Sequence, residues 1–146
     1  MKHKLWLFVA LLFSGLGFAQ AEEVVFFTPE MVLEAAKGFG SAELTDGHVI
    51  GRMEGIRYGV FPRDCKDGRC DSLQFAAGWK DTTPPLEKIN AFNRKVAWGT
   101  AYLDKDGDLA ITYYVEGKYG MSKRNLEESF KNMGILLKTA KEDFSD

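Results

Sequence analysis

The sequence contains few of the residues and motifs that carry catalytic or metal-binding chemistry. Its 146 residues include only two cysteines and two histidines. No G-x-S-x-G nucleophile motif occurs, and the Gly38-Phe39-Gly40 stretch precedes no phosphate-loop pattern. No internal repeat, low-complexity segment or long run of like charge is visible. These absences argue against hydrolytic, phosphate-binding and repeat-protein classes.

Excess positive charge is also lacking. The formal net charge is −2 at pH 7, whereas domains that bind nucleic acid carry dense patches of lysine and arginine. The sequence therefore predicts no nucleic-acid partner.

A long apolar run occurs only near the N-terminus. Lys2 and Lys4 precede apolar residues 5–18, and small residues flank Gln20 at Ala19 and Ala21. This order is typical of a secretory signal peptide, and the run is shorter than the ~20 residues of a membrane span. We expect residues 1–21 to be a cleaved signal and residues 22–146 a single bacterial domain, periplasmic or secreted, without a membrane span. The alternative is a retained N-terminal anchor.

The remaining sequence alternates between helix and strand patterns. Helices are expected over 28–40, 82–96 and from Ser122 onward, with Thr28, Thr83 and Ser122 as N-caps. Strands are expected over 48–53, 56–61, 72–80, 98–104 and 109–116. The order α-β-β-β-α-β-β-α, rich in hairpins, predicts an α+β domain with an antiparallel sheet of about five strands flanked by helices.

Hydrophobic periodicity predicts which side chains are buried. Period-two alternation in 72–80 separates an apolar set from a polar set, and it places Tyr113 and Tyr114 on opposite faces. The residues expected in the core are Leu73, Phe75, Ala77 and Trp79 of this strand, Leu86, Ile89, Phe92 and Val96 of the second helix, and Leu126, Phe130, Met133, Leu137 and Ala140 of the third.

One family shows the same succession of segments. The run GRMEGIRYGVF, the cysteine loop and SLQFAAGW, then PPLEKINAFNRK and WGTAYLDKDGDLAITYYV, together resemble the YbjN family of bacterial proteins, over about Val49 to Leu137. The most specific segment runs from Leu86 to Asn93. The resemblance implies a fold similar to type III secretion chaperones and a regulatory role. It supplies no catalytic residue. The signal-like segment and the paired cysteines, which many members lack, indicate that this chain is an exported branch of the family.

Cys65 and Cys70 flank the turn sequence Lys-Asp-Gly-Arg. An exported protein meets an oxidising environment, and cross-strand neighbours are close enough for a disulfide. We therefore predict a structural disulfide, which would stabilise the fold by about 2 kcal/mol in the chain-entropy model. The alternatives are a redox pair, although four residues separate the cysteines where two are usual, and a zinc site, which needs four ligands.

Two further sites are candidates for metal binding or catalysis. Asp104, Asp106 and Asp108 alternate as in a calcium loop, but Leu109 and Val115 occupy the positions where that loop requires glycine and glutamate. We expect a hairpin turn there. A catalytic triad would have to use His48, but the sequence motifs that usually accompany such a triad are missing. The simpler interpretation is a solvated residue beside a turn.

We therefore expect an exported non-catalytic module that binds an unidentified protein or peptide through a sheet edge or an aromatic-lined face, with a chaperone-like or regulatory role. A homodimer is compatible with the resemblance. The sequence assigns no enzyme activity, catalytic residue, metal, cofactor or binding residue. The alternatives are a secreted enzyme inhibitor, an enzyme, and a sensor of a small ligand or metal.

Overall fold

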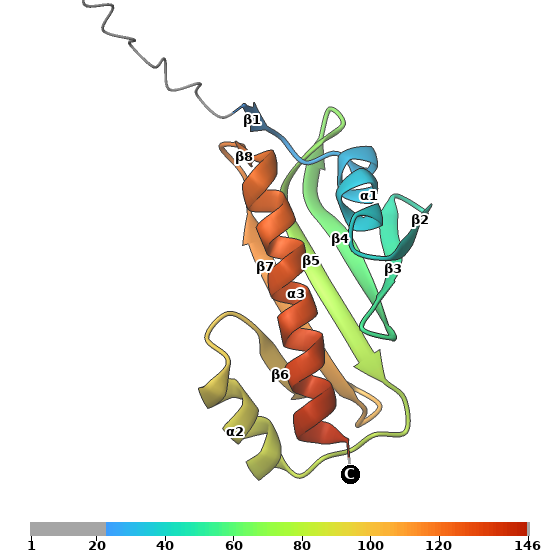
Figure 1. Cartoon of the computed structure of the whole chain (residues 1–146), viewed down its shortest axis with the longest axis vertical. Coiled ribbons are helices and arrows are strands. Elements are labelled where there is room, and N and C mark those ends of the chain that lie inside the picture. Colours follow the sequence, from blue (N-terminus) through green and yellow to red (C-terminus); the bar gives the residue numbers. More distant parts are fainter. Residues whose placement is uncertain (1–22, 146) are drawn as a thin grey trace, which may run out of the picture.

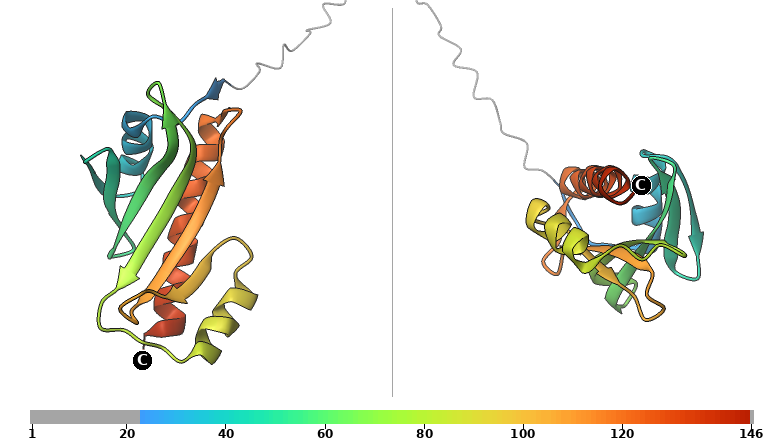
Figure 2. Two further views of the ribbon diagram at one scale, coloured as in Figure 1. Left: turned by 180° about the vertical axis from the view of Figure 1, so that it is seen from behind. Right: turned by 90° about the horizontal axis from the view of Figure 1, so that it is seen from below.

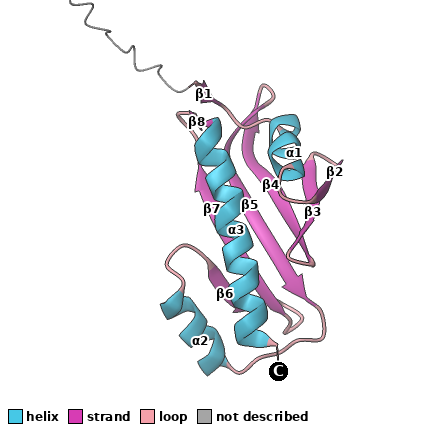
Figure 3. Cartoon of the chain, in the orientation of Figure 1, coloured by secondary structure: helices cyan, strands magenta, loops and turns pink. Residues whose placement is uncertain are grey.

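The computed structural model describes residues 23–145, so the expected signal peptide lies outside the described residues. The described chain folds into helices and short to medium strands (Figures 1 and 3). In chain order they are β1 Val24–Val25, α1 Pro29–Lys37, β2 Ser41–Thr45, β3 His48–Met53, β4 Ile56–Lys66, β5 Arg69–Trp79, α2 Leu86–Lys95, β6 Thr100–Leu103, β7 Leu109–Glu116, β8 Met121–Ser122 and α3 Lys123–Phe144.

The main sheet is antiparallel and has six strands in the order β2-β3-β4-β5-β7-β6, while β1 pairs with β8 separately. This confirms the predicted α+β class with an antiparallel sheet. Strand β2 was not predicted: Ser41–Thr45 does alternate polar and apolar residues, but the segment has only five residues and four of them are exposed. The Asp46-Gly47 turn that joins β2 to β3 has positive φ at both residues, 49° and 78°, which suits a tight hairpin.

The caps of two helices match the prediction. The Thr28 hydroxyl accepts a hydrogen bond from the Met31 amide (3.2 Å), and the Ser122 hydroxyl accepts one from the Asn125 amide (3.1 Å). These bonds satisfy amide groups that have no partner inside the helix.

The start of α2 differs from the prediction. The helix begins at Leu86 after Pro85, whose ψ of 147° is extended. Thr83 is not its cap, and its hydroxyl donates instead to the Gly107 carbonyl (2.9 Å). Successive prolines explain the shift, because a residue that precedes proline avoids the helical region. Leu86 consequently lies outside the core, at 61% exposure.

The core lies between the sheet and the helices on one of its faces. Phe130 of α3 lies at its centre and contacts three other aromatic rings. The distances between ring centroids are 5.0 Å to Phe75 (edge-on), 5.5 Å to Phe39 (stacked) and 6.4 Å to Tyr58 (edge-on). The other predicted α3 residues are buried with it, and α3 runs along the length of the sheet (Figure 1). Burial of this apolar stripe supplies the main stabilisation of the helix.

The opposite face of the sheet is not covered by a helix of the described residues. Seen from behind, the strands lie in front and α3 is behind them (Figure 2, left). The view from below shows α1 and α3 on the same side of the strands (Figure 2, right). One surface of an antiparallel sheet commonly faces solvent in this way.

The two edges of the sheet also differ. Beside β6, the Asn93 side chain accepts a hydrogen bond from the Ala101 amide (2.8 Å) and donates one to the Ala101 carbonyl (2.9 Å). The amide group thus takes the place of a neighbouring strand. Along β2, residues 23–145 provide no comparable side-chain bond to the backbone. Asn93 therefore closes the edge at which an unpaired strand would invite association.

Candidate functional site: the open face of the sheet

Strand register defines the uncovered face. Side chains of paired residues point the same way, and every second residue along a strand returns to that face. One row of pairs crosses the sheet from Ile50, and a second row runs through Phe61, Gln74 and Tyr114. We call the face that carries both rows the open face. Its residues used below are His48, Ile50, Arg52, Arg57, Gly59, Phe61, Arg63, Gln74, Ala76, Gly78, Tyr102 and Tyr114.

A cluster of planar groups occupies the β3 and β4 side of the open face. The His48 ring stacks on Phe61 with centroids 5.0 Å apart, and the Arg63 guanidinium carbon lies 5.8 Å from the same ring. Arg63 Nε also donates to Gln74 Oε1 (3.1 Å) on the neighbouring strand. Cross-strand contacts of this kind fix side-chain positions, so the cluster presents a preformed surface.

A hollow of about 290 Å³ adjoins this cluster. Small residues, Gly59, Ala76 and Gly78, line it between the larger side chains of Ile50 and Phe61. Gly59 is covered, because a Cβ there would lie 2.6 Å from the Phe61 ring. Above Gly78 the space is accessible, since a Cβ would contact only the Leu109 carbonyl oxygen at 3.7 Å.

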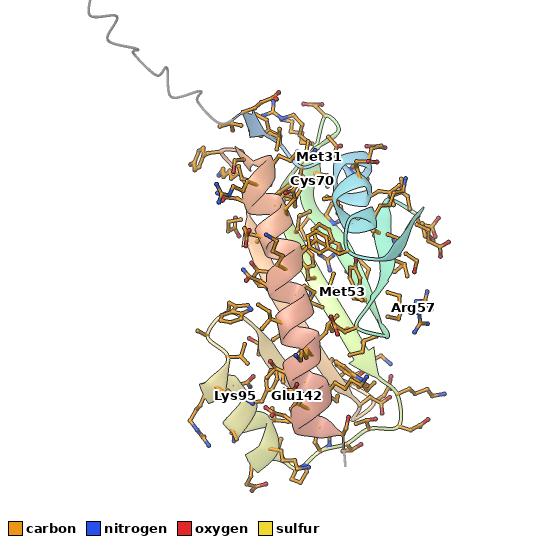
Figure 4. All side chains as sticks on the ribbon, viewed as in Figure 1. Met31, Met53, Arg57, Cys70, Lys95 and Glu142 are labelled. Atoms are coloured by element: carbon orange, nitrogen blue, oxygen red, sulfur yellow. A yellow bond between two sulfur atoms is a disulfide. The ribbon has the colours of Figure 1, made fainter. Side chains whose placement is uncertain are left out.

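Arg57 lies at the rim of this hollow. It also lines a second hollow of about 280 Å³ that continues toward β2 beside Ile50, Arg52 and Glu43. Figure 4 shows the Arg57 side chain extending from β4, away from the other labelled side chains. Arg52 donates to the Gly55 carbonyl (2.8 Å), whereas Arg57 makes no hydrogen bond or ion pair within residues 23–145. Arg57 is thus an unpaired cation beside an apolar surface.

Tyr58 shows how different the covered face is. Its side chain is 2% exposed, and its hydroxyl has no hydrogen-bond partner within the described residues. Burial raises the pKa of Tyr58 from 10.0 to about 12, because ionisation would place a charge away from water. The hydroxyl therefore stays protonated at neutral pH and points away from the open face, over Gly51.

The cysteines lie at the far end of the β4–β5 hairpin. Cys65 and Cys70 are register partners, and their Sγ atoms are 2.07 Å apart, at disulfide distance. Cys70 is buried, and its amide donates to the Phe27 carbonyl (2.9 Å). The Arg69 guanidinium lies 3.5 Å from the centroid of the Phe26 ring. The pair therefore fastens the hairpin and the N-terminal segment together, and its oxidation state stays a prediction.

The two other candidate sites, the aspartates of residues 104–108 and His48, have local structural roles. Asp104 Oδ1 accepts hydrogen bonds from the amides of Asp106 (2.9 Å) and Asp108 (3.0 Å), within a hairpin turn between β6 and β7 that was predicted. The described residues contain no group of three histidine, cysteine or acidic side chains arranged to hold a metal. The His48 neighbours are the Phe61 ring and the Asp46 carbonyl, 3.3 Å from Nδ1.

A larger hollow of about 480 Å³ lies between α1 and α3. Met31, Ala35, Phe39 and Leu126 supply its apolar lining, and Glu34, Lys123 and Glu127 its polar lining. Because both helices contribute apolar side chains, it is a gap between packed helices. Its charged groups are mixed in sign, whereas the charged residue that lines the hollow over Gly78 is Arg57.

The sequence analysis missed Arg57 and the hollow beside it. Alternation in 56–61 could have placed Arg57, Gly59 and Phe61 on one face. The covering of that face depends on where α1 and α3 dock, which no local pattern specifies. The split of Tyr113 from Tyr114 was predicted and is confirmed: Tyr113 packs on Phe75 at 5.5 Å, while Tyr114 is 59% exposed.

The described chain is thus an α+β protein with one helix-covered and one open sheet face, and none of its helices is long and apolar enough to span a membrane. The sequence model of the YbjN family, described as "Putative bacterial sensory transduction regulator", matches residues 28–145. The chain belongs to the YbjN family, as its resemblance indicated.

A solved structure agrees with this fold. The crystal structure of E. coli YbjN, described as "a putative transcription regulator", superposes with a TM-score of 0.59 at 13% identity, covering 82% of this chain and 95% of that one. An uncharacterized protein from Methanothermobacter thermautotrophicus gives a TM-score of 0.45 at 16% identity, covering 82% and 100%. No curated protein matches the sequence.

Proposed function

We propose that the protein is an exported, non-catalytic module that binds another protein or a peptide on its open face. The observation that carries this proposal is a preformed sheet surface that exposes Tyr114 and places the exposed Arg57 at the rim of an accessible hollow. An aromatic ring offers a large contact area at a low entropic cost, and arginine adds directional hydrogen bonds. Such residues are enriched at protein interfaces.

The family description supports a regulatory context for this binding, because regulators act through partners. Export is supported by the signal-like order of residues 1–21 and by the two sulfurs at disulfide distance. A chaperone-like role would use the same surface.

Export has a direct test in the intact mass of the protein isolated from a bacterial host without reductant. We expect a chain that begins at Glu22, recovered outside the cytoplasm and lighter by two hydrogens than its reduced form. A full-length cytoplasmic chain with two thiols would contradict export and the disulfide.

Binding can be tested by site-specific photo-crosslinking in the native compartment. A photoreactive amino acid replaces Tyr114 on the open face or, as a matched control, Ile135 on α3, which is similarly exposed at 53%. We expect a discrete heterologous adduct from position 114 and none from position 135. Absence of an adduct at 114, identical adducts at both positions, or an adduct of two copies of this chain would count against the proposal.

A further inference from the structure

We propose that the open face recognises an acidic extended segment that carries a large apolar side chain. The apolar side chain would enter the hollow over Gly78, and a carboxylate next to it would pair with Arg57. This inference rests on the proposed function and names the chemistry of the partner.

The apolar half of the proposal follows from the shape of the hollow. Its volume is about 290 Å³, and apolar cavities of ~150 Å³ accommodate benzene. One leucine or phenylalanine side chain would therefore fit between Ile50 and Phe61. The hollow needs no rearrangement to accept such a side chain, because the space above Gly78 is already accessible and the Phe61 ring is fixed by stacking on His48.

The acidic half follows from charge. Arg52, Arg57 and Arg63 all belong to the β3–β4 side of the open face, where the strand pairs place only Glu43 as an acidic neighbour. The face also carries Glu116 on β7, which is in the same cross-strand row as Arg63, with Ser72 between them. The chain as a whole is acidic, with a net charge of −2, so this local excess of arginine is a distinct feature. An acidic segment would be attracted to it.

Arg57 is the specific contact in this surface. Arg63 already donates to Gln74, and Arg52 to the Gly55 carbonyl, whereas no acceptor among residues 23–145 takes a hydrogen bond from Arg57. A guanidinium can bind a carboxylate through two parallel hydrogen bonds. Because Arg57 lines both hollows, a bound segment that crosses the strands would pass it.

Single-stranded nucleic acid is the competing ligand for a surface with arginine and aromatic rings. Such binding stacks bases on exposed ring faces, but one face of Phe61 is already occupied by the stacked His48 ring. The geometry thus favours a peptide, for which Phe61 is a wall of the hollow.

The experiment is a ¹⁵N NMR titration of the oxidised mature protein at low salt with three capped heptapeptides: Glu-Asp-Glu-Leu-Glu-Asp-Glu, the same peptide with serine replacing leucine, and Lys-Arg-Lys-Leu-Lys-Arg-Lys. We expect amide shifts around Ala76 and Gly78 with the acidic leucine peptide. The dissociation constant should rise about tenfold with the serine peptide and beyond the measurable range with the basic one.

Variants assign the contacts. Arg57→Gln should weaken binding of the acidic leucine peptide about tenfold, as expected for loss of a charged hydrogen bond. Gly78→Leu, which fills the hollow, should weaken it at least as much. The matched control Arg94→Gln removes an exposed arginine from α2 and should leave affinity unchanged.

Three results would overturn the inference. The first is equal affinity for the basic peptide and the acidic leucine peptide. The second is the same affinity for the acidic leucine peptide in Arg57→Gln and Arg94→Gln. The third is tighter, Arg57-dependent binding of an oligothymidine than of the acidic leucine peptide. Any of these together with a heterologous adduct from position 114 would leave the proposed binding function standing with a different partner chemistry. Absence of a heterologous adduct from position 114 would instead contradict the proposed function itself.

Discussion

The two faces of the main sheet are built from the same strands and yet differ in almost every property. On the covered face, Tyr58 and Phe75 are buried against Phe130. On the open face, glycine and alanine lie beside half-buried Ile50 and Phe61, and Arg57 has no partner among residues 23–145. The covered face therefore holds the fold together, while the open face retains groups whose interactions are incomplete.

This difference separates the residues that stabilise the fold from those of the proposed binding surface. A side chain on the covered face contributes through burial and close packing, so its loss leaves a cavity. A side chain on the open face contributes little to folding and is available to a partner. Substitutions of similar size on opposite faces should therefore have unlike effects on unfolding and on binding.

The largest effect should come from Phe130→Ala. It removes a fully buried ring that contacts three other aromatic rings, and we expect the free energy of unfolding to fall by about 3–5 kcal/mol in urea denaturation. Tyr114→Ala, the matched control on the open face, should change it by less than about 1 kcal/mol. Similar losses for both variants would show that the open face is covered in solution.

Two strand glycines provide a smaller contrast. A Cβ at Gly51 would lie 2.6 Å from the buried Tyr58 ring, so Gly51→Ala should cost about 1–3 kcal/mol of unfolding free energy. Gly78→Ala on the open face meets only ordinary contacts and should stabilise by about 0.5–1 kcal/mol, because alanine restricts the unfolded chain. A gain of unfolding free energy in Gly51→Ala together with a loss in Gly78→Ala would contradict the assignment of the faces.

The edge strand β6 offers a third comparison. Asn93→Ala removes both hydrogen bonds to the Ala101 backbone, and we expect a loss of about 1–2 kcal/mol together with self-association visible by light scattering. Asn93→Asp keeps the acceptor for the Ala101 amide but loses the donor, so its effect should be intermediate. A monomeric, fully stable Asn93→Ala variant would show that the side chain does not protect this edge.

The smallest effect at neutral pH should come from Tyr58→Phe, because the deleted hydroxyl has no hydrogen-bond partner in the described part of the chain. Above pH 10 the two proteins should diverge. The folded state keeps the Tyr58 proton up to a pKa of about 12, whereas the unfolded chain releases it near 10.0, so wild-type stability falls as pH rises through this window. Denaturation between pH 9 and 12 should show a shallower loss for the variant, and parallel curves would contradict it.

Local signals were sufficient for much of the fold. The Thr28 and Ser122 caps, the α3 stripe from Leu126 to Ala140 and the alternation in 72–79 all appear as predicted, because each depends on residues a few positions apart. The polar β2 strand and the start of α2 were missed. The alternation in β2 covers only five residues, four of them exposed, so its strand state depends on pairing with β3. At α2 the second proline delays the helix by its effect on the backbone.

The candidate site was less accessible to prediction. Periodicity assigns Arg57, Gly59 and Phe61 to a common face of β4, and the sequence alone determines that grouping. Only the tertiary structure decides that α1 and α3 cover the other face, that β5 lies between β4 and β7, and that Arg57 borders the hollow over Gly78. The reason is physical: spacing along a strand fixes which side chains point the same way, whereas the exposure of a face depends on packing between elements far apart in the chain.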